Sequence, residues 1–430
     1  MNRLMLLAVA VAGIACHASG PLIPEVGVSG MGSAGAYVAR AEDNSALFHN
    51  PAGLAKLTKG ELTFSMQFAA QRSTYANIGQ TTWYSDKSAE AFPSIIVNKT
   101  FGRFGLAAGR TPTSFYELEW KSPTYPGRFG ATGSKFEAET ISLGGSFAIT
   151  KQWAVGVAWR SNDLDVQYQR AWNRAVDDGF GDLAFYEVNE TRSMSGNGDQ
   201  FVLGIQYYRG RKFSAGLSFE SGVDVDVDGA RSFSLSPGFD ADRRFTTDFA
   251  AMFEDGDART RVWLPQRINV GAAFRTTIRT RVEVNLGRED WSDWVSSDYE
   301  LTGAPSGQES ITREFDEITT FRVSGDFQQR KALLWRLGLA SRNSVVSTQN
   351  LEPSFPDADQ FLIAGGVSYS RGDWVFEAAY MYVQYRDRKV RNLEFIPVDT
   401  PPDYVSPTGE NGVFETQRHH LNLGVRWRFD

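Results

Sequence analysis

The feature that most constrains this chain is a two-residue alternation of apolar and polar side chains, which recurs about fourteen times. In the closing stretch 420–429, one face carries only large apolar side chains, namely Leu421, Leu423, Val425, Trp427 and Phe429. Successive side chains of a β-strand point to opposite sides, so this stretch predicts a strand with two different faces. Because large aromatic residues recur on the apolar side, the pattern predicts a barrel that points its apolar face outward.

Runs of about ten alternating residues are typical of transmembrane β-strands. We expect such strands at 61–70, 92–100, 104–110, 136–149, 152–162, 199–209, 212–222, 263–275, 280–290, 317–327, 332–342, 359–370, 373–386 and 416–429. Connections after the even-numbered strands are short, whereas those after the odd-numbered strands are long and polar, such as 163–198, 223–262 and 387–415. An even-numbered barrel with both termini at one end requires this order. We therefore predict an all-β fold, a 14-stranded antiparallel transmembrane β-barrel in the outer membrane of a Gram-negative bacterium, with both termini periplasmic.

Composition narrows the alternatives. A net charge of -7 argues against nucleic-acid binding. The mean hydropathy of -0.32 and 22% charged residues look soluble, but half of each strand of a membrane barrel faces a polar interior. A soluble all-β protein would also show alternation, yet it would rarely expose so many Trp, Phe and Tyr side chains on one face. The membrane barrel is the better interpretation.

The first eighteen residues resemble a secretory signal. Arg3 provides the positive charge, Leu4–Ala15 the apolar core and Cys16–Ala18 a cleavage site of small residues. Lipidation at Cys16 is the weaker alternative, since the usual leucine three residues earlier is missing. Cleavage after Ala18 leaves a chain without cysteine, which suits an exported protein that must stay unfolded until it reaches its membrane.

The sequence contains partial matches to cofactor and metal motifs, but none of them is complete. The stretch 30–35 satisfies G-x-G-x-x-G but lacks the strand and helix of a dinucleotide site. The start of an EF-hand is imitated at 224–229, but its twelfth position is Leu235 rather than Glu, so a loop calcium ion is improbable. Adjacent His419 and His420 would face opposite sides of a strand. We expect no enzyme activity, no catalytic residue, no metal site and no cofactor.

Some forty residues precede the first strand, and the lumen of a closed barrel is the obvious place for them. They include Gly30-Met31-Gly32-Ser33-Ala34-Gly35 and, further on, Asn50-Pro51-Ala52. This stretch resembles the hatch of the FadL-type outer-membrane transporters of long-chain fatty acids and aromatic hydrocarbons. Weaker similarities lie at 290–294, 356–359 and 365–369. The resemblance covers essentially the whole mature chain and implies three parts: signal peptide 1–18, hatch 19–60 and barrel 61–430.

By this resemblance, the hatch plugs the lumen and gates it through Asn50, Pro51 and Ala52, which sit against an inward kink in the third strand. The kink opens a lateral gap through which an apolar substrate leaves. The third strand fits, because it is short and because Gly105 and Gly109 permit a bend. Taken alone, these would be ordinary strand glycines and Asn-Pro an ordinary turn.

The expected function is passive uptake of hydrophobic small molecules, such as long-chain fatty acids, by capture among extracellular loops. Candidate ligand contacts are the aromatics of two predicted loops: Phe115, Tyr116, Trp120, Phe245, Phe249 and Phe253. Expected partners are the substrate, outer-membrane lipids and lipopolysaccharide, and the barrel-assembly machinery, and we expect a monomer. Two alternatives stay open: a water-filled porin for polar solutes, and an adhesin or structural barrel with an inert lumen.

Overall fold

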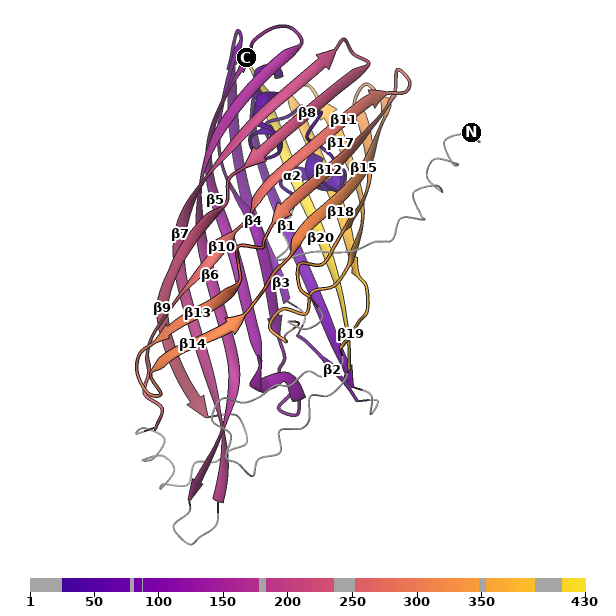
Figure 1. Ribbon diagram of the computed structural model, residues 1–430. Coiled ribbons are helices and arrows are strands. Elements are labelled where there is room, and N and C mark those ends of the chain that lie inside the picture. Colours follow the sequence, from indigo (N-terminus) through magenta and orange to yellow (C-terminus); the bar gives the residue numbers. More distant parts are fainter. Residues whose placement is uncertain are drawn as a thin grey trace.

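The computed structural model describes residues 25–77, 81–86, 88–177, 183–235, 252–347, 351, 353–390 and 412–430. Its regular structure is almost entirely one antiparallel sheet (Figure 1). Twelve uninterrupted strands form most of the wall: β1 (Gly60–Asn77), β3 (Ser88–Phe101), β4 (Phe104–Glu119), β5 (Gly133–Ala148), β6 (Trp153–Asp177), β7 (Leu183–Arg209), β12 (Thr280–Asp290), β15 (Glu317–Arg330), β16 (Leu333–Arg342), β17 (Gln360–Arg371), β18 (Trp374–Tyr385) and β20 (Gly412–Phe429). Two further wall strands are interrupted, as β8 (Phe213–Glu220) with β9 (Val223–Leu235) and β10 (Gly256–Leu264) with β11 (Gln266–Arg275).

The sheet closes on itself, as an outward-facing apolar barrel requires. The first wall strand, β1, pairs with the last, β20, from Gly60–Phe429 to Asn77–Gly412. Six short connections gather at the end of the barrel that also holds the C-terminus: 102–103, 149–152, 210–212, 276–279, 331–332 and 372–373 (Figure 1). The predicted 14-stranded antiparallel barrel is confirmed, and so is the order of short and long connections.

Apolar side chains change from the outer to the inner face part-way along the strands. On β6, Trp153 and Val157 point outward and are 47% and 49% exposed, as suits a surface covered by lipid. Further along the same strand, Leu164 and Tyr168 point inward and are 1% and 5% exposed, while Asp163 faces outward. The strand therefore leaves the membrane between Val157 and Leu164. Beyond that point its outer face contacts water, and its inner face packs against an apolar core inside the barrel.

The predicted long loops are consequently wrong in part. Residues 163–177 and 183–198 extend β6 and β7 as a paired hairpin, and 223–262 contains β9 and β10. Four more short strands decorate this end: β2 (Thr82–Tyr84), β13 (Ser296–Leu301), β14 (Gly307–Thr312) and β19 (Arg388–Val390). A 3-10 helix, η3 (Pro126–Phe129), lies in the connection from β4 to β5.

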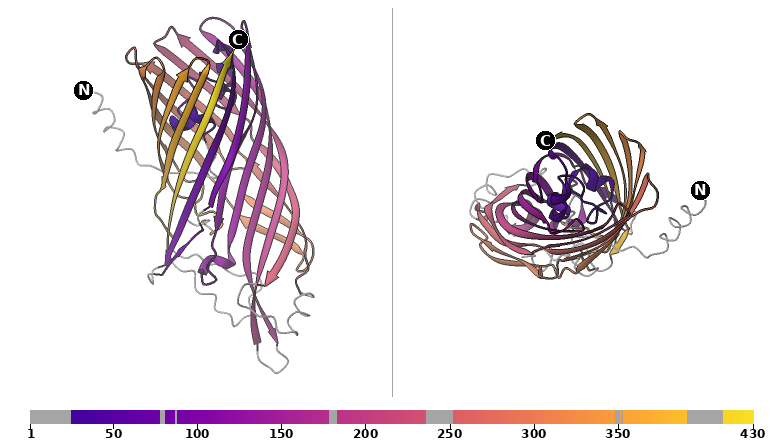
Figure 2. Two further views of the ribbon diagram at one scale, coloured as in Figure 1. Left: turned by 180° about the vertical axis from the view of Figure 1, so that it is seen from behind. Right: turned by 90° about the horizontal axis from the view of Figure 1, so that it is seen from above.

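The N-terminal segment, residues 25–59, lies inside the barrel near the end with the short connections (Figure 2, right). It contains two short helices and one 3-10 helix: α2 (Gly27–Gly32), α3 (Ala46–His49) and η2 (Pro51–Lys56). Its many Gly, Ala and Ser residues let it pack tightly against the wall, and nearly all of them are buried. In the described part of the chain, no helix has the length and apolar character needed to cross a membrane.

Candidate functional site

An aromatic cavity lies inside the barrel at the end with the long connections. The space among its lining residues, including the part that is open to solvent, is about 590 Å³. Residues from β4, β5, β6, β10, β13 and the connection between β16 and β17 line it. Its aromatic lining comprises Tyr116, Phe136, Tyr168, Trp294, Tyr299, Phe315 and Phe355. Two cations, Lys135 and Arg313, lie at the lining, and Lys135 is paired with Glu137 at 2.8 Å. The cavity is thus suited to an apolar molecule.

The predicted aromatic contacts divide among three places. Tyr116 lines the cavity, and Trp120 stacks on Tyr125 in the adjoining apolar core with ring centroids 4.4 Å apart. Phe115 lies on the neighbouring side of β4, against β3. Phe253 belongs to a separate cluster around Trp172. Two further predicted contacts, at positions 245 and 249 (both phenylalanines), lie outside the described residues.

We call residues 343–347, 351 and 353–359, which lie in the connection between β16 and β17, the β16–β17 loop. Its Ser354 and Phe355 line the aromatic cavity. Its Ser354 carbonyl accepts a hydrogen bond from the Tyr116 hydroxyl at 2.9 Å, and its Pro353 carbonyl accepts one from Trp120 Nε1 at 3.2 Å. Asp357 anchors the base of the loop, since its Oδ2 accepts bonds from Ser344 Oγ and the Val345 amide. The carboxyl group is fully enclosed, and this burial raises the pKa of Asp357 to about 7.

We expect the β16–β17 loop to open more often at about pH 8 than at about pH 5. The pKa of Asp357 in the closed loop, about 7, lies above its usual value of about 4. Protonated Asp357 therefore stabilises the closed loop, and this stabilisation is lost as the pH rises from about 4 to about 7. Hydrogen exchange of the loop amides, corrected for the intrinsic effect of pH, measures the change. D357N should remove the pH dependence, while D359N should keep it. Equal opening at both pH values in the unmodified protein would contradict the expectation.

A gap interrupts the wall between β3 and β4. These strands pair from Phe101–Phe104, beside their tight turn, only as far as Ile95–Arg110. Beyond that point, 88–94 form a ladder only with β1 and 111–119 only with β5, although all of these residues are described. We call these two facing segments the β3–β4 gap. At the far end of the stretch, the Asp86 amide donates a hydrogen bond to the Glu119 carbonyl at 2.9 Å.

Two prolines explain where the β3–β4 gap begins. If the register of the hairpin continued, Pro93 would lie opposite Pro112. Neither residue has an amide hydrogen, and proline is tolerated in sheets mainly at edges. In addition, β4 carries an extra residue, Thr113, relative to β5, and such a bulge bends a strand. Side chains close the space, since the rings of Phe92 and Phe115 lie 4.8 Å apart.

The glycines predicted at a lateral opening lie elsewhere on β4. Gly105 and Gly109 are paired with β3 on one side and with β5 on the other, so they lie in the continuous part of the wall and not in the β3–β4 gap. A Cβ on Gly105 would lie 2.5 Å from the Leu54 carbonyl, so this glycine lets the N-terminal segment approach the wall. The sequence signal that was missed is a pair of prolines, with Pro93 inside one predicted strand and Pro112 just beyond the end of the next.

Asn50 fastens the N-terminal segment to β7 and β8 rather than to the third wall strand. Its Nδ2 lies 3.1 Å from the Val38 carbonyl, 3.1 Å from that of Ile205 and 3.3 Å from that of Leu217. Its Oδ1 accepts a bond from the Ala52 amide at 3.2 Å. The expected contact of this motif with the third wall strand is therefore replaced: the backbone of residues 50–52 rests on glycines of β6 and β7.

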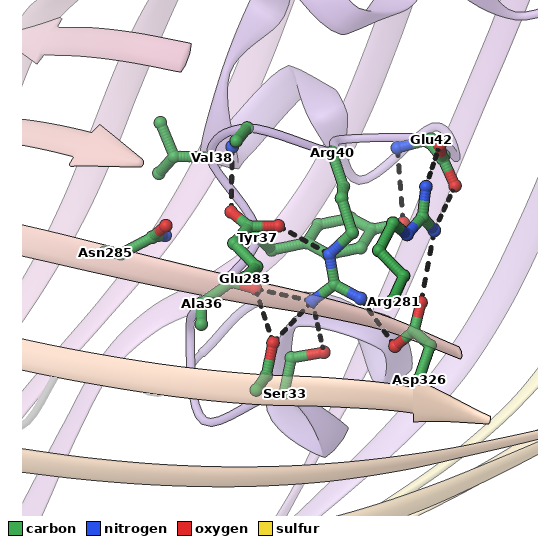
Figure 3. Close-up of polar contacts among 12 residues, drawn as sticks. Ser33, Ala36, Tyr37, Val38, Arg40, Glu42, Arg281, Glu283, Asn285 and Asp326 are labelled. Carbon is green, nitrogen blue, oxygen red and sulfur yellow. Dashed lines mark hydrogen bonds and ion pairs between the residues drawn. The ribbon is translucent and has the colours of Figure 1, made fainter. Parts of the chain in front are cut away.

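Ion pairs hold the other side of the N-terminal segment (Figure 3). Arg40 is completely buried; its Nε lies 2.5 Å from Glu283 of β12, and its Nη1 lies 2.5 Å from Asp326 of β15. Arg40 Nη2 also donates to the Ala36 carbonyl and to Ser324 Oγ. Three further pairs join the segment to the wall: Glu42–Arg281, Asp43–Arg426 and Glu25–Arg322. The segment thus has a charged, fixed side and a side packed on glycine.

Comparison with known proteins decides the family. A family model described as "Outer membrane protein transport protein (OMPP1/FadL/TodX)" matches residues 8–407. The chain belongs to this family. The resemblance predicted from the sequence is confirmed, and with it the outer-membrane location and a role in transport rather than catalysis.

Individual relatives are distant but match along most of their length. A long-chain fatty acid transport protein of Salmonella typhi is 24% identical over 404 residues, which is 85% of this chain and 87% of the relative. The fold is shared with a Pseudomonas aeruginosa FadL homologue (15% identity, TM-score 0.79, 96% and 100% of the two chains). It is also shared with the P. putida toluene transporter TodX (14% identity, TM-score 0.75, 95% and 99%).

Proposed function

We propose that this OMPP1/FadL/TodX-family protein carries hydrophobic small molecules passively through the outer membrane, by capture in the aromatic cavity and lateral release through the β3–β4 gap. The observation that carries the proposal is the position of the gap beside the cavity. Phe115 and Tyr116 are consecutive residues of β4, and one packs in the gap while the other lines the cavity. A molecule leaving the cavity along β4 therefore meets the unpaired edges at once.

The N-terminal segment supports a lateral rather than an axial route. It occupies the lumen between the cavity and the periplasmic end, where Arg40, Asn50 and the glycine contacts hold it. An apolar molecule would have to cross this charged, packed layer to go straight through, which is costly. A second cavity beside Phe48 and His49 has a mostly charged lining, which includes Arg160, Glu220, Arg267, Glu289, Arg322 and Arg342, so it does not suit an apolar molecule. The proposed gating movement is therefore a small shift of residues 46–54, which include Asn50, Pro51 and Ala52, relative to the wall beside the β3–β4 gap.

Affinity for apolar molecules follows from the lining. Burial of apolar surface provides about 25 cal/mol per Å², so a long alkyl chain or aromatic ring in the aromatic cavity can reach about micromolar affinity. The relatives are named for a long-chain fatty acid and for toluene, and both compounds are largely apolar.

A water-filled porin would need an open lumen, and an adhesin would not need the β3–β4 gap. We propose outer-membrane lipids and lipopolysaccharide as surroundings, the barrel-assembly machinery for insertion, and a monomer.

The lateral route is tested by replacing both prolines at the start of the gap with threonine, a good strand former. The double variant Pro93→Thr, Pro112→Thr is expected to extend the β3–β4 ladder and to lower uptake of an apolar probe by about tenfold or more. Uptake of radiolabelled oleate and toluene into cells that produce equal amounts of folded protein measures the effect, and hydrogen exchange of 88–94 shows whether the ladder has formed.

Pro126→Thr is the matched control, because Pro126 starts the 3-10 helix η3 and has no part in the gap. It should leave uptake unchanged. If the double variant protects the amides of 88–94 but uptake stays normal, the substrate does not leave through the gap.

A further inference from the structure

Arg418 stands apart from the other buried arginines. It lies on β20, faces the lumen and is 3% exposed. Of the ten buried arginines in the described part of the chain, the other nine each have a carboxylate within 4.0 Å: Arg40, Arg160, Arg170, Arg192, Arg231, Arg322, Arg336, Arg342 and Arg426. Arg418 has none among the described residues. A buried guanidinium without a counter-ion is costly, so its presence calls for an explanation.

The contacts of Arg418 place it between the aromatic cavity and the β3–β4 gap. Its guanidinium lies 5.1 Å from the ring centre of Tyr116, which lines the cavity, and 5.9 Å from that of Tyr385. Its Nη1 makes one long bond, of 3.5 Å, to the carbonyl of Phe115 at the gap. Its Nε has no acceptor within the described structure. The two rings hold the charge in place without neutralising it.

Polar groups without partners surround Arg418 on the lumen face. Gln71 lies directly opposite on β1, and its Oε1 accepts no hydrogen bond within the described part. His420 and Asn422 lie two and four residues further along β20, on the same face as Arg418. In the described part of the chain, both ring nitrogens of His420 and Oδ1 of Asn422 have no hydrogen-bond partner. All four side chains are buried. Buried polar groups in such a row are normally satisfied by water or by a ligand.

We propose that Arg418 is the counter-ion for the carboxylate of an amphipathic substrate whose apolar tail lies in the aromatic cavity, so that the transporter selects long-chain carboxylic acids over neutral hydrocarbons. The inference rests on the proposed function and names its substrate class. A guanidinium presents parallel N–H donors that match the two oxygens of a carboxylate. A neutral hydrocarbon would leave the charge of Arg418 uncompensated while displacing any water around it.

The experiment compares two ligands that differ only in charge, oleate and methyl oleate, at a pH where the acid is ionised. Binding to detergent-purified protein is followed by quenching of tryptophan fluorescence. The unmodified protein is expected to bind oleate about 10- to 100-fold more tightly than the ester. Arg418→Gln should bring the two dissociation constants together by weakening oleate alone. Arg418→Lys should give an intermediate ratio, since it keeps the charge and loses the fork.

Arg128→Gln is the matched control, because Arg128 is a half-buried arginine of η3 that pairs with Glu187 at 2.8 Å and does not line the aromatic cavity. It should leave the ratio unchanged. Heat-modifiable migration in gels shows that each variant is folded. A ratio near one in the unmodified protein, or a ratio unaffected by Arg418→Gln, overturns the inference. If both ligands bind equally well and are taken up, the proposed function survives and only the selectivity fails, whereas failure to bind either ligand contradicts the proposed function itself.

Discussion

Replacing Gly204 with valine is expected to dislodge the N-terminal segment from the wall and to convert the closed barrel into an ion-conducting pore. A Cβ at Gly204 would lie 2.2 Å from Asn50 Oδ1 and 3.0 Å from the Ala52 amide nitrogen. The Ala52 amide nitrogen also packs closely against Gly156 of the neighbouring strand β6, so this part of the backbone has no room to move away. Since neither partner can yield cheaply, the conflict costs about 3 kcal/mol, the upper end of ordinary overpacking.

The consequence is measured as conductance and permeability. A cost of about 3 kcal/mol raises the population of the dislodged segment about 100-fold. Single-channel recordings in planar bilayers should show openings that the unmodified protein lacks, and cells should become sensitive to large antibiotics. Gly365→Val is the control, because Gly365 faces outward and its added Cβ would meet its nearest atom at 3.9 Å. If a folded G204V barrel conducts no more than the unmodified protein, the contacts of Asn50 are not what holds the N-terminal segment in the lumen.

Strand number and turn order could be predicted from the sequence because both are local. Each run of alternation sets its own two faces, and a turn such as the one at Gly102 is recognisable by a short break between two runs. Strand length could not be predicted by the same means. The outer face of β6 is apolar up to Trp159 and carries Asp163 beyond it, while the apolar row moves to the inner face with Leu164. A search for outward apolar residues stops at that change of surroundings.

The parts of the site differ in the same way. The opposition of Pro93 and Pro112 follows from the tight turn between β3 and β4, so a register drawn through that hairpin would have found it. The partner of Arg40 could not be found from the sequence, because Glu283 lies 243 residues away and many other carboxylates were available. Nor could the sequence show that Arg418 has no carboxylate partner among the described residues, because that absence can be seen only once the side chains around Arg418 are placed in space.

Replacing Arg40 with methionine is expected to release the charged side of the N-terminal segment. The change leaves the buried Glu283 carboxylate without the arginine that contacts it and leaves Asp326 with Arg281 as its remaining partner, and breaking a buried pair in this way costs about 3 to 5 kcal/mol. Release is measured by adding Ser29→Cys and Cys16→Ser. Ser29 lies in α2 and is buried, so a maleimide should label the new thiol only when the segment leaves the wall. Labelling should become about 100-fold faster or more.

Two controls separate loss of the ion pair from loss of side-chain packing. Lys59→Met removes an exposed cation that pairs with Asp373 at 2.9 Å, and exposed pairs contribute about 1 kcal/mol or less, so labelling should hardly change. The triple variant Arg40→Met, Glu283→Gln, Asp326→Asn removes the uncompensated charges and should restore much of the protection. If the single and triple variants label equally fast, the packing of the Arg40 side chain, and not its charge, holds this side of the segment.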